Sequence, residues 1–212
     1  MNTGGALARV IRSGADLRTA AEERCELCAA PVPQGHRHLY DGERQEVLCA
    51  CRPCSLLFVR DGTSGAHYRL IPERRLRLPP LDTAPLGVPV GLAFFVPHAD
   101  GTVVAHYPGP AGAVHGQVAA AAWREVATGC PLVGSVAPDV EALLMNTARG
   151  AGHHWIVPVD DCFRLVALVR REWRGLSGGT RVWPAVERFF TDLADSTEGS
   201  TTWEASGSED RP

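Results

Sequence analysis

The chain has 212 residues, 45 % of them hydrophobic and 21 % charged, so it is long enough and apolar enough to bury a core. A formal net charge of −3 excludes a dedicated nucleic-acid binder with a strongly basic surface. No apolar run reaches the roughly 18 residues of a membrane span, and the arginine-bearing N-terminus does not match a signal peptide. We therefore expect a cytoplasmic protein.

The first predicted element is a short N-terminal helix within residues 1–23. Leu7, Val10 and Ile11 lie at helical spacing and form a thin apolar stripe, which Gly14 weakens.

Residues 24–58 form a cysteine-rich segment that holds five of the seven cysteines of the chain. In a cytosolic protein thiols stay reduced, so clustered cysteines indicate a metal site and not disulfides. Two Cys-x-x-Cys pairs, in which two tight turns each present two sulfurs, match the ligand spacing of a structural zinc ribbon. The predicted ligands are Cys25, Cys28, Cys51 and Cys54.

Between the two pairs, "RHLY" and "QEVL" read as two strands joined by the turn "DGER". A unit of this size cannot be stable through hydrophobic burial alone, whereas zinc contributes on the order of 10 kcal/mol to such folds. The expected metal is Zn²⁺. A rubredoxin-type iron centre or an iron–sulfur cluster is the alternative, because an all-sulfur tetrahedron suits zinc and iron alike.

Three further residues of this segment each have two possible roles. Cys49 is either a buried free cysteine on a strand or an extra ligand at the metal site. His36 and His38 are two residues apart and so share a face if they lie on a strand, where they could hold a second, transferable metal. The simpler interpretation is that both are solvated loop residues.

Residues 59–86 are rich in arginine and proline and are predicted as a linker or as edge strands. The main domain is predicted to span residues 87–194. Its first two strands are "VPVGLAFFV" and "TVVAHY", joined by the hairpin turn "PHADG", and "HWIVPV" reads as a buried strand.

Four helices are predicted in the main domain. They are "GQVAAAAWREVAT", "APDVEALLMNTARG" with Pro138 in its first turn, "DDCFRLVALVRREWRG" capped by Asp160 or Asp161, and "VWPAVERFFTDLA". The acidic residues 195–212 are predicted to be a disordered tail. The fold class is thus α+β: a small four-cysteine, zinc-ribbon-like module followed by an α+β domain with a short antiparallel sheet and several helices.

The motifs "CELC…HRHLYD…LCACRPC", "PDVEALLMN", "VPVDDCFRLVALVRREWRGLSGG" and "VWPAVERFF" together resemble an uncharacterised bacterial family encoded beside nickel–iron hydrogenase genes. The resemblance covers roughly residues 20–195. It implies an accessory protein of a redox metalloenzyme, and the five cysteines from Cys25 to Cys54 match the cysteine pattern of the family.

No complete catalytic constellation is present in the sequence, so the chain is not expected to be an enzyme. The preferred hypothesis is a non-catalytic, metal-stabilised accessory or assembly protein that binds a protein partner, such as a hydrogenase subunit or a maturation factor. The alternative is a rubredoxin-like or iron–sulfur electron carrier. A zinc ribbon that binds nucleic acid through the arginines of residues 69–77 is disfavoured by the total charge and the acidic tail.

Overall fold

A computed structural model describes residues 23–59, 67–87, 91–175 and 178–201 of the chain. It has two antiparallel sheets and helices packed against them, which confirms the α+β class. The helix predicted within residues 1–23 lies outside the described residues.

The smaller sheet, here called the ribbon sheet, has the strand order β2-β1-β3. Its strands are β1 (Arg37–Asp41), β2 (Glu46–Ala50) and β3 (Tyr68–Leu70). The predicted hairpin is confirmed, with Leu39 opposite Leu48 in the register. Buried Asp41 holds the turn, because its Oδ1 accepts hydrogen bonds from the backbone N–H groups of Glu43 and Arg44.

The larger sheet has the order β4-β9-β8-β5-β6-β7, with every neighbouring pair antiparallel. Its strands are β4 (Leu76–Arg77), β5 (Leu92–Pro97), β6 (Val103–Gly109), β7 (Gly112–Val118), β8 (Glu141–Asn146) and β9 (His153–Pro158). The predicted hairpin of β5 and β6 and the buried strand β9 are both present.

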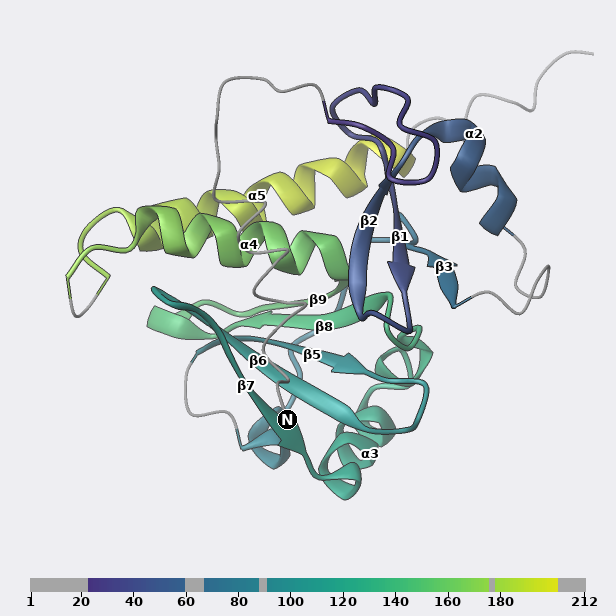
Figure 1. The fold of residues 1–212 in the computed structure, drawn as a ribbon. Helices are drawn as coiled ribbons and strands as arrows, with labels where there is room; N and C mark the ends of the chain where they lie inside the picture. Colours follow the sequence, from purple (N-terminus) through teal and green to yellow (C-terminus); the bar gives the residue numbers. More distant parts are fainter. Residues whose placement is uncertain (1–22, 60–66, 88–90, 176–177, 202–212) are drawn as a thin grey trace, which may run out of the picture.

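Helices cover both faces of the larger sheet (Figure 1). Helices α4 (Val159–Glu172) and α5 (Val182–Thr201) lie side by side on one face, and their apolar residues join Phe94, Leu144 and Trp155 in one core. Helix α3 (Ala120–Gly129) covers the other face over Phe95 and Ile156. The remaining helical segments are short: α2 (Arg52–Ser55), η1 (Leu56–Phe58), η2 (Ala84–Leu86), η3 (Val133–Ser135) and η4 (Ala148–Gly150).

The helix predicted in "APDVEALLMNTARG" is wrong, because this segment forms the central strand β8. All six residues of β8 are buried, since helices cover the sheet on both sides. A strand buried on both faces is apolar at successive positions and loses the alternation that normally marks a strand. Glu141 is buried as well, in an ion pair with Arg74.

Two other elements differ in extent from the prediction. Strand β7 was not predicted: the helix predicted in "GQVAAAAWREVAT" begins only at Ala120, and its first three predicted residues, Gly116 to Val118, belong to β7. Helix α5 continues to Thr201, so the first residues of the predicted acidic tail are helical. Residues 202–212 lie outside the described part of the chain.

Residues 71–75 connect the two sheets. The backbone N–H of Ile71 donates to the carbonyl of His38 in the ribbon sheet, while the Ile71 side chain is buried in the core beneath α4 and α5. The next two arginines bind the larger domain: Arg74 pairs with buried Glu141, and Arg75 pairs with buried Asp161. These contacts fix the ribbon sheet beside α4 (Figure 1).

Gly91 is predicted to be sensitive to substitution. A Cβ at this position would lie 2.4 Å from the backbone nitrogen of Ala148, and the carbonyl of Gly91 already accepts hydrogen bonds from Thr147 and Ala148. We expect Gly91→Ala to lower the free energy of unfolding by about 1–3 kcal/mol because the backbone must shift. Urea unfolding measures this, with Gly116→Ala as the control, since a Cβ there meets open space. Equal stability of the two variants would contradict the prediction.

No helix in the described part of the chain combines the length and the apolar character that crossing a membrane requires.

Candidate metal centre

The first cysteine pair lies on a tight turn before β1. The backbone N–H of Ala29 donates to the carbonyl of Cys25, and the N–H of Cys25 donates to the carbonyl of Ala30. Ala29 adopts a positive φ of 59°, which turns the chain sharply after Cys28. The turn therefore brings the two side chains of the pair to the same side, with Cys25 buried and Cys28 exposed.

The second pair lies where β2 leads into helix α2. Cys51 has an extended backbone conformation and occupies the N-cap of α2, and the N–H of Ser55 donates to its carbonyl. Pro53 suits the first turn of this helix because it lacks an N–H that would need a partner. One helical turn thus places Cys54 beside Cys51.

The two turns face each other and bring four sulfurs together. The Sγ atoms of Cys25, Cys28, Cys51 and Cys54 all lie within 4.8 Å of one another. Tetrahedral coordination at Zn–S distances of about 2.3 Å requires sulfur–sulfur separations of about 3.8 Å. Cys28 Sγ and Cys51 Sγ lie 3.6 Å apart, and all seven cysteines are free thiols. The set can therefore hold one metal ion with little rearrangement.

The environment gives two of these thiols very different pKa values. Burial raises the pKa of Cys25, but backbone N–H groups of Cys51 and Cys28 outweigh it and lower that pKa to about 6. Hydrogen bonds with the Cys51 and Cys28 side chains raise the pKa of Cys54 to about 12. Metal binding must release the protons that these thiols carry, because the thiolate is the ligand.

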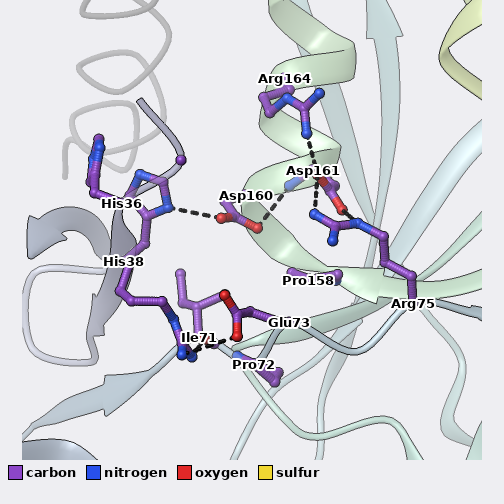
Figure 2. A pocket seen from close by; sticks show the side chains of 12 residues that line it. His36, His38, Ile71, Pro72, Glu73, Arg75, Pro158, Asp160, Asp161 and Arg164 are labelled. Carbon is purple, nitrogen blue, oxygen red and sulfur yellow. Dashed lines mark hydrogen bonds and ion pairs between the residues drawn. The ribbon is translucent and has the colours of Figure 1, made fainter. Parts of the chain in front are cut away.

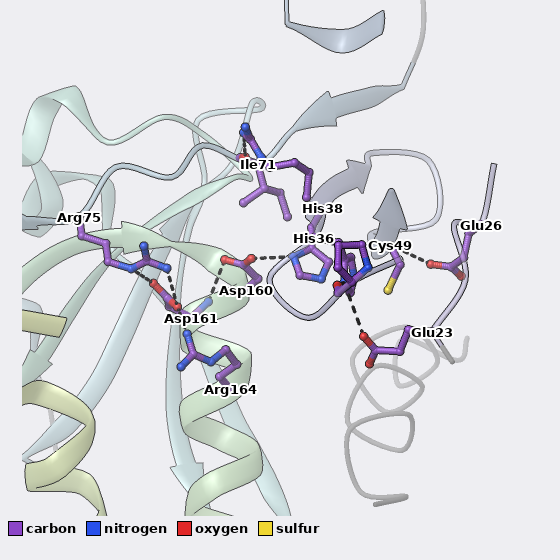
Figure 3. Close-up of polar contacts among 12 residues, drawn as sticks. Glu23, Glu26, His36, His38, Cys49, Ile71, Arg75, Asp160, Asp161 and Arg164 are labelled. Atoms are coloured by element: carbon purple, nitrogen blue, oxygen red, sulfur yellow. Dashed lines mark hydrogen bonds and ion pairs between the residues drawn. The ribbon is translucent and has the colours of Figure 1, made fainter. Parts of the chain in front are cut away.

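Cys49 does not belong to this four-sulfur set. It lies with His36 and His38 in a second group, whose potential ligand atoms are also within 4.8 Å of one another. Figure 3 shows the two rings beside the Cys49 sulfur, and the ring centroids of the histidines are 4.6 Å apart. Of the two histidine interpretations, the solvated-loop one does not fit His36, because only 6 % of its side chain is exposed.

Asp160 reaches this second group from helix α4. Its Oδ2 lies 2.8 Å from Nδ1 of His38, 122 residues away in sequence. Burial lowers the pKa of His38, but hydrogen bonds with Asp160 and Cys49 outweigh it and raise that pKa to about 9. The predicted capping role of Asp160 or Asp161 is not observed: Pro158 is the N-cap of α4, and no side chain caps the helix.

A cavity of about 510 Å³ opens between the ribbon sheet and α4. Figure 2 shows His36 and His38 on one side of it and Asp160, Asp161 and Arg164 on the other. Charged side chains in its wall form ion pairs: Arg75 and Arg164 both bind Asp161. The cavity therefore has several charged groups in its wall and borders the second ligand group.

The other sequence candidates have structural roles. Arg69, Arg74 and Arg75 are engaged with carboxylates of the larger domain, which does not favour the proposed nucleic-acid surface. The aromatic side chains of the C-terminal third belong to the core: Trp155, Phe189 and Phe190 are buried, and Trp173 and Trp183 pack against the same cluster.

A family model described as a family of unknown function (DUF5947) matches residues 24–197. The chain belongs to this family. The matched region contains both cysteine pairs, the second ligand group and the whole larger sheet. A search of the curated proteins and a search of the solved structures found no match. The family description assigns no activity, so the predicted link to nickel–iron hydrogenases stays a prediction.

Proposed function

We propose that this DUF5947 protein is a non-catalytic, cytoplasmic accessory protein in which the four-sulfur site holds a permanent Zn²⁺. The single observation that carries the proposal is the closed set of four convergent sulfurs at the tips of two turns. Four protein ligands complete the tetrahedral sphere of zinc and leave no position for substrate or water, which is the pattern of a structural site.

We further propose that the ribbon module presents a docking surface for a protein partner. Three apolar side chains directly after Cys54 are exposed: Leu56 by 62 %, Leu57 by 66 % and Val59 by 60 %. Neighbouring exposed apolar side chains on a small module are typical of a protein–protein contact. The partner is a subunit of a redox metalloenzyme, such as a nickel–iron hydrogenase, or its maturation machinery. The family resemblance described above supports this choice.

Metal analysis of protein purified under anaerobic conditions tests the first part. We expect at least one zinc per chain and no absorbance in the visible region, because Zn²⁺ has a filled d shell. Protein that contains neither zinc nor iron after expression with both metals available would refute the metal site.

Co-purification with a hydrogenase subunit or maturation factor tests the second part. The double variant Leu56→Ser/Leu57→Ser should lose the complex, whereas Val114→Ser should keep it. Val114 is exposed by 69 % but lies on β7, in the other sheet. Failure to recover any such partner from native cells, or equal binding by the two variants, would count against the proposed docking surface.

An electron carrier with iron in the same four sulfurs is the second candidate. The exposure of Cys28 favours it, because a sulfur ligand at the surface provides a short route for an electron to a partner. Iron in place of zinc, with thiolate-to-iron absorbance that bleaches on reduction, would establish this function instead.

A further inference from the structure

The ribbon sheet places His38 and Cys49 directly opposite each other on β1 and β2. The backbone N–H and carbonyl of Cys49 bond to Glu26, and the carbonyl of His38 bonds to Ile71. Both residues therefore direct their backbone groups away from each other. Such a non-hydrogen-bonded antiparallel pair brings the two side chains especially close on one face of the sheet.

His36 adds a third donor with a buried free lone pair. Its Nδ1 lies 3.0 Å from the carbonyl oxygen of Pro33 and 3.5 Å from Oε2 of Glu23, which both accept, so in the neutral ring Nδ1 carries the proton and Nε2 carries the lone pair. That Nε2 atom is buried and has no hydrogen-bond partner, on a side chain only 6 % exposed. Buried polar atoms are nearly always satisfied, so an orphaned imidazole nitrogen beside a thiol and another imidazole indicates a missing ligand.

His38 is oriented in the same way by Asp160. A carboxylate that holds Nδ1 of an imidazole fixes the ring and leaves Nε2 to face the opposite direction. This carboxylate–histidine arrangement is the usual support of a metal-bound imidazole. The Pro33 carbonyl and the Asp160 carboxylate thus each bind Nδ1 of one imidazole and leave its Nε2 available for a metal ion. Figure 3 shows the contact between Asp160 and His38.

We propose that Nε2 of His36, Nε2 of His38 and Sγ of Cys49 form a second metal site, separate from the four-sulfur site. Two imidazoles and a thiolate suit a divalent transition ion of borderline softness, with Zn²⁺ as the principal occupant. Tetrahedral coordination needs N···N and N···S separations of about 3.3–3.6 Å. One nitrogen of each imidazole and the Cys49 Sγ already lie within 4.8 Å of one another, so small side-chain rotations complete the site.

The second site differs from the first in having three protein ligands. Its fourth position is left for water or for an external ligand, and both histidines line the 510 Å³ cavity from which such a ligand would approach. Open coordination makes the metal exchangeable, whereas four sulfurs hold theirs permanently. None of the proposed ligands belongs to the four-sulfur set, so variants of the second site can lose their metal while the four-sulfur site keeps its own.

Zinc stoichiometry of the full chain tests the proposal. After saturation with Zn²⁺ and removal of free ions, the wild type should retain two zinc ions per chain. The variants Cys49→Ser and His36→Ala should each retain one, with unchanged circular dichroism. The control His115→Ala removes an exposed histidine on β7 and should retain two.

Titration with Co²⁺ monitors metal binding at the same site by absorbance. With Zn²⁺ held in the four-sulfur site, filling the second site should add a thiolate-to-cobalt absorption band that is absent from both Cys49→Ser and His36→Ala. One equivalent of metal in the wild type at saturating Zn²⁺ would overturn the proposal. So would two equivalents in both His36→Ala and Cys49→Ser. If Cys49→Ser fails to fold, His36→Ala alone decides, because it leaves both strands of the hairpin unchanged.

Asp160 is a positioning residue in this proposal. Asp160→Ala should weaken Zn²⁺ binding at the second site by about 10–100-fold and leave the first equivalent unchanged. A purely structural role for Asp160 would lower stability without changing the dissociation constant of the second equivalent.

Discussion

Replacing Cys51 with serine is expected to remove all tightly bound metal and to unfold residues 24–58. A structural zinc site contributes on the order of 10 kcal/mol to the folding of such a module. The apolar cluster of the ribbon sheet is too small to replace that contribution, since its buried members among the described residues are Leu39, Leu48 and Ala50. The second ligand group lies on the same sheet and should be lost with it.

Metal analysis and amide hydrogen exchange measure this outcome. Amides of β1 and β2 should exchange freely in Cys51→Ser, while those of β8 and β9 stay protected by their own helices. Cys130→Ala is the matched control, because Cys130 is buried under α3 and lies outside both ligand groups. Full metal content and protected β1 amides in Cys51→Ser would show that the four sulfurs do not hold the module together.

Arg75→Ala should be the most destabilising change outside the metal centre, at about 3 kcal/mol. Arg75 Nε lies 2.6 Å and Nη2 3.1 Å from the carboxylate of Asp161, which is only 1 % exposed. Removing the guanidinium leaves this buried charge with Arg164, whose own side chain is 65 % exposed. A buried ion that loses its main partner carries a desolvation cost without compensation.

Chemical denaturation of two further variants tests whether loss of the ion pair causes the lower stability of Arg75→Ala. Arg77→Ala removes an exposed arginine two residues away and should change stability by no more than about 0.5 kcal/mol. The double variant Arg75→Met/Asp161→Leu should recover most of the loss, because it removes the buried carboxylate together with its partner. No recovery in the double variant would mean that the ion pair is not the source of the effect.

Local sequence signals predicted the ribbon module well. The spacing of the two cysteine pairs, the alternation in "RHLY" and "QEVL", and the turn "DGER" all act over a few residues, and the structure has the expected hairpin. Strand β8 shows where such signals fail. Glu, Ala, Leu and Met favour helices, but the position of this segment at the centre of a sheet overrides that preference.

The second ligand group could be predicted only in part. The two-residue spacing of His36 and His38 suggests a shared face, but the pairing with Cys49 depends on the hairpin register. A one-residue slip in that register would separate the imidazole of His38 from the sulfur. The sequence could not have placed Asp160 beside this group, because its contact with His38 joins residues 122 positions apart.

The order of ligands along the chain has a consequence for biosynthesis. All four sulfurs of the metal centre are present once residue 54 has left the ribosome, whereas β4 cannot pair until Leu76 meets Ile156 of β9. Domains begin to fold from the N-terminal side during translation. The metal is therefore expected to load onto the nascent chain, well before helix α4, which carries Asp160, has been synthesised.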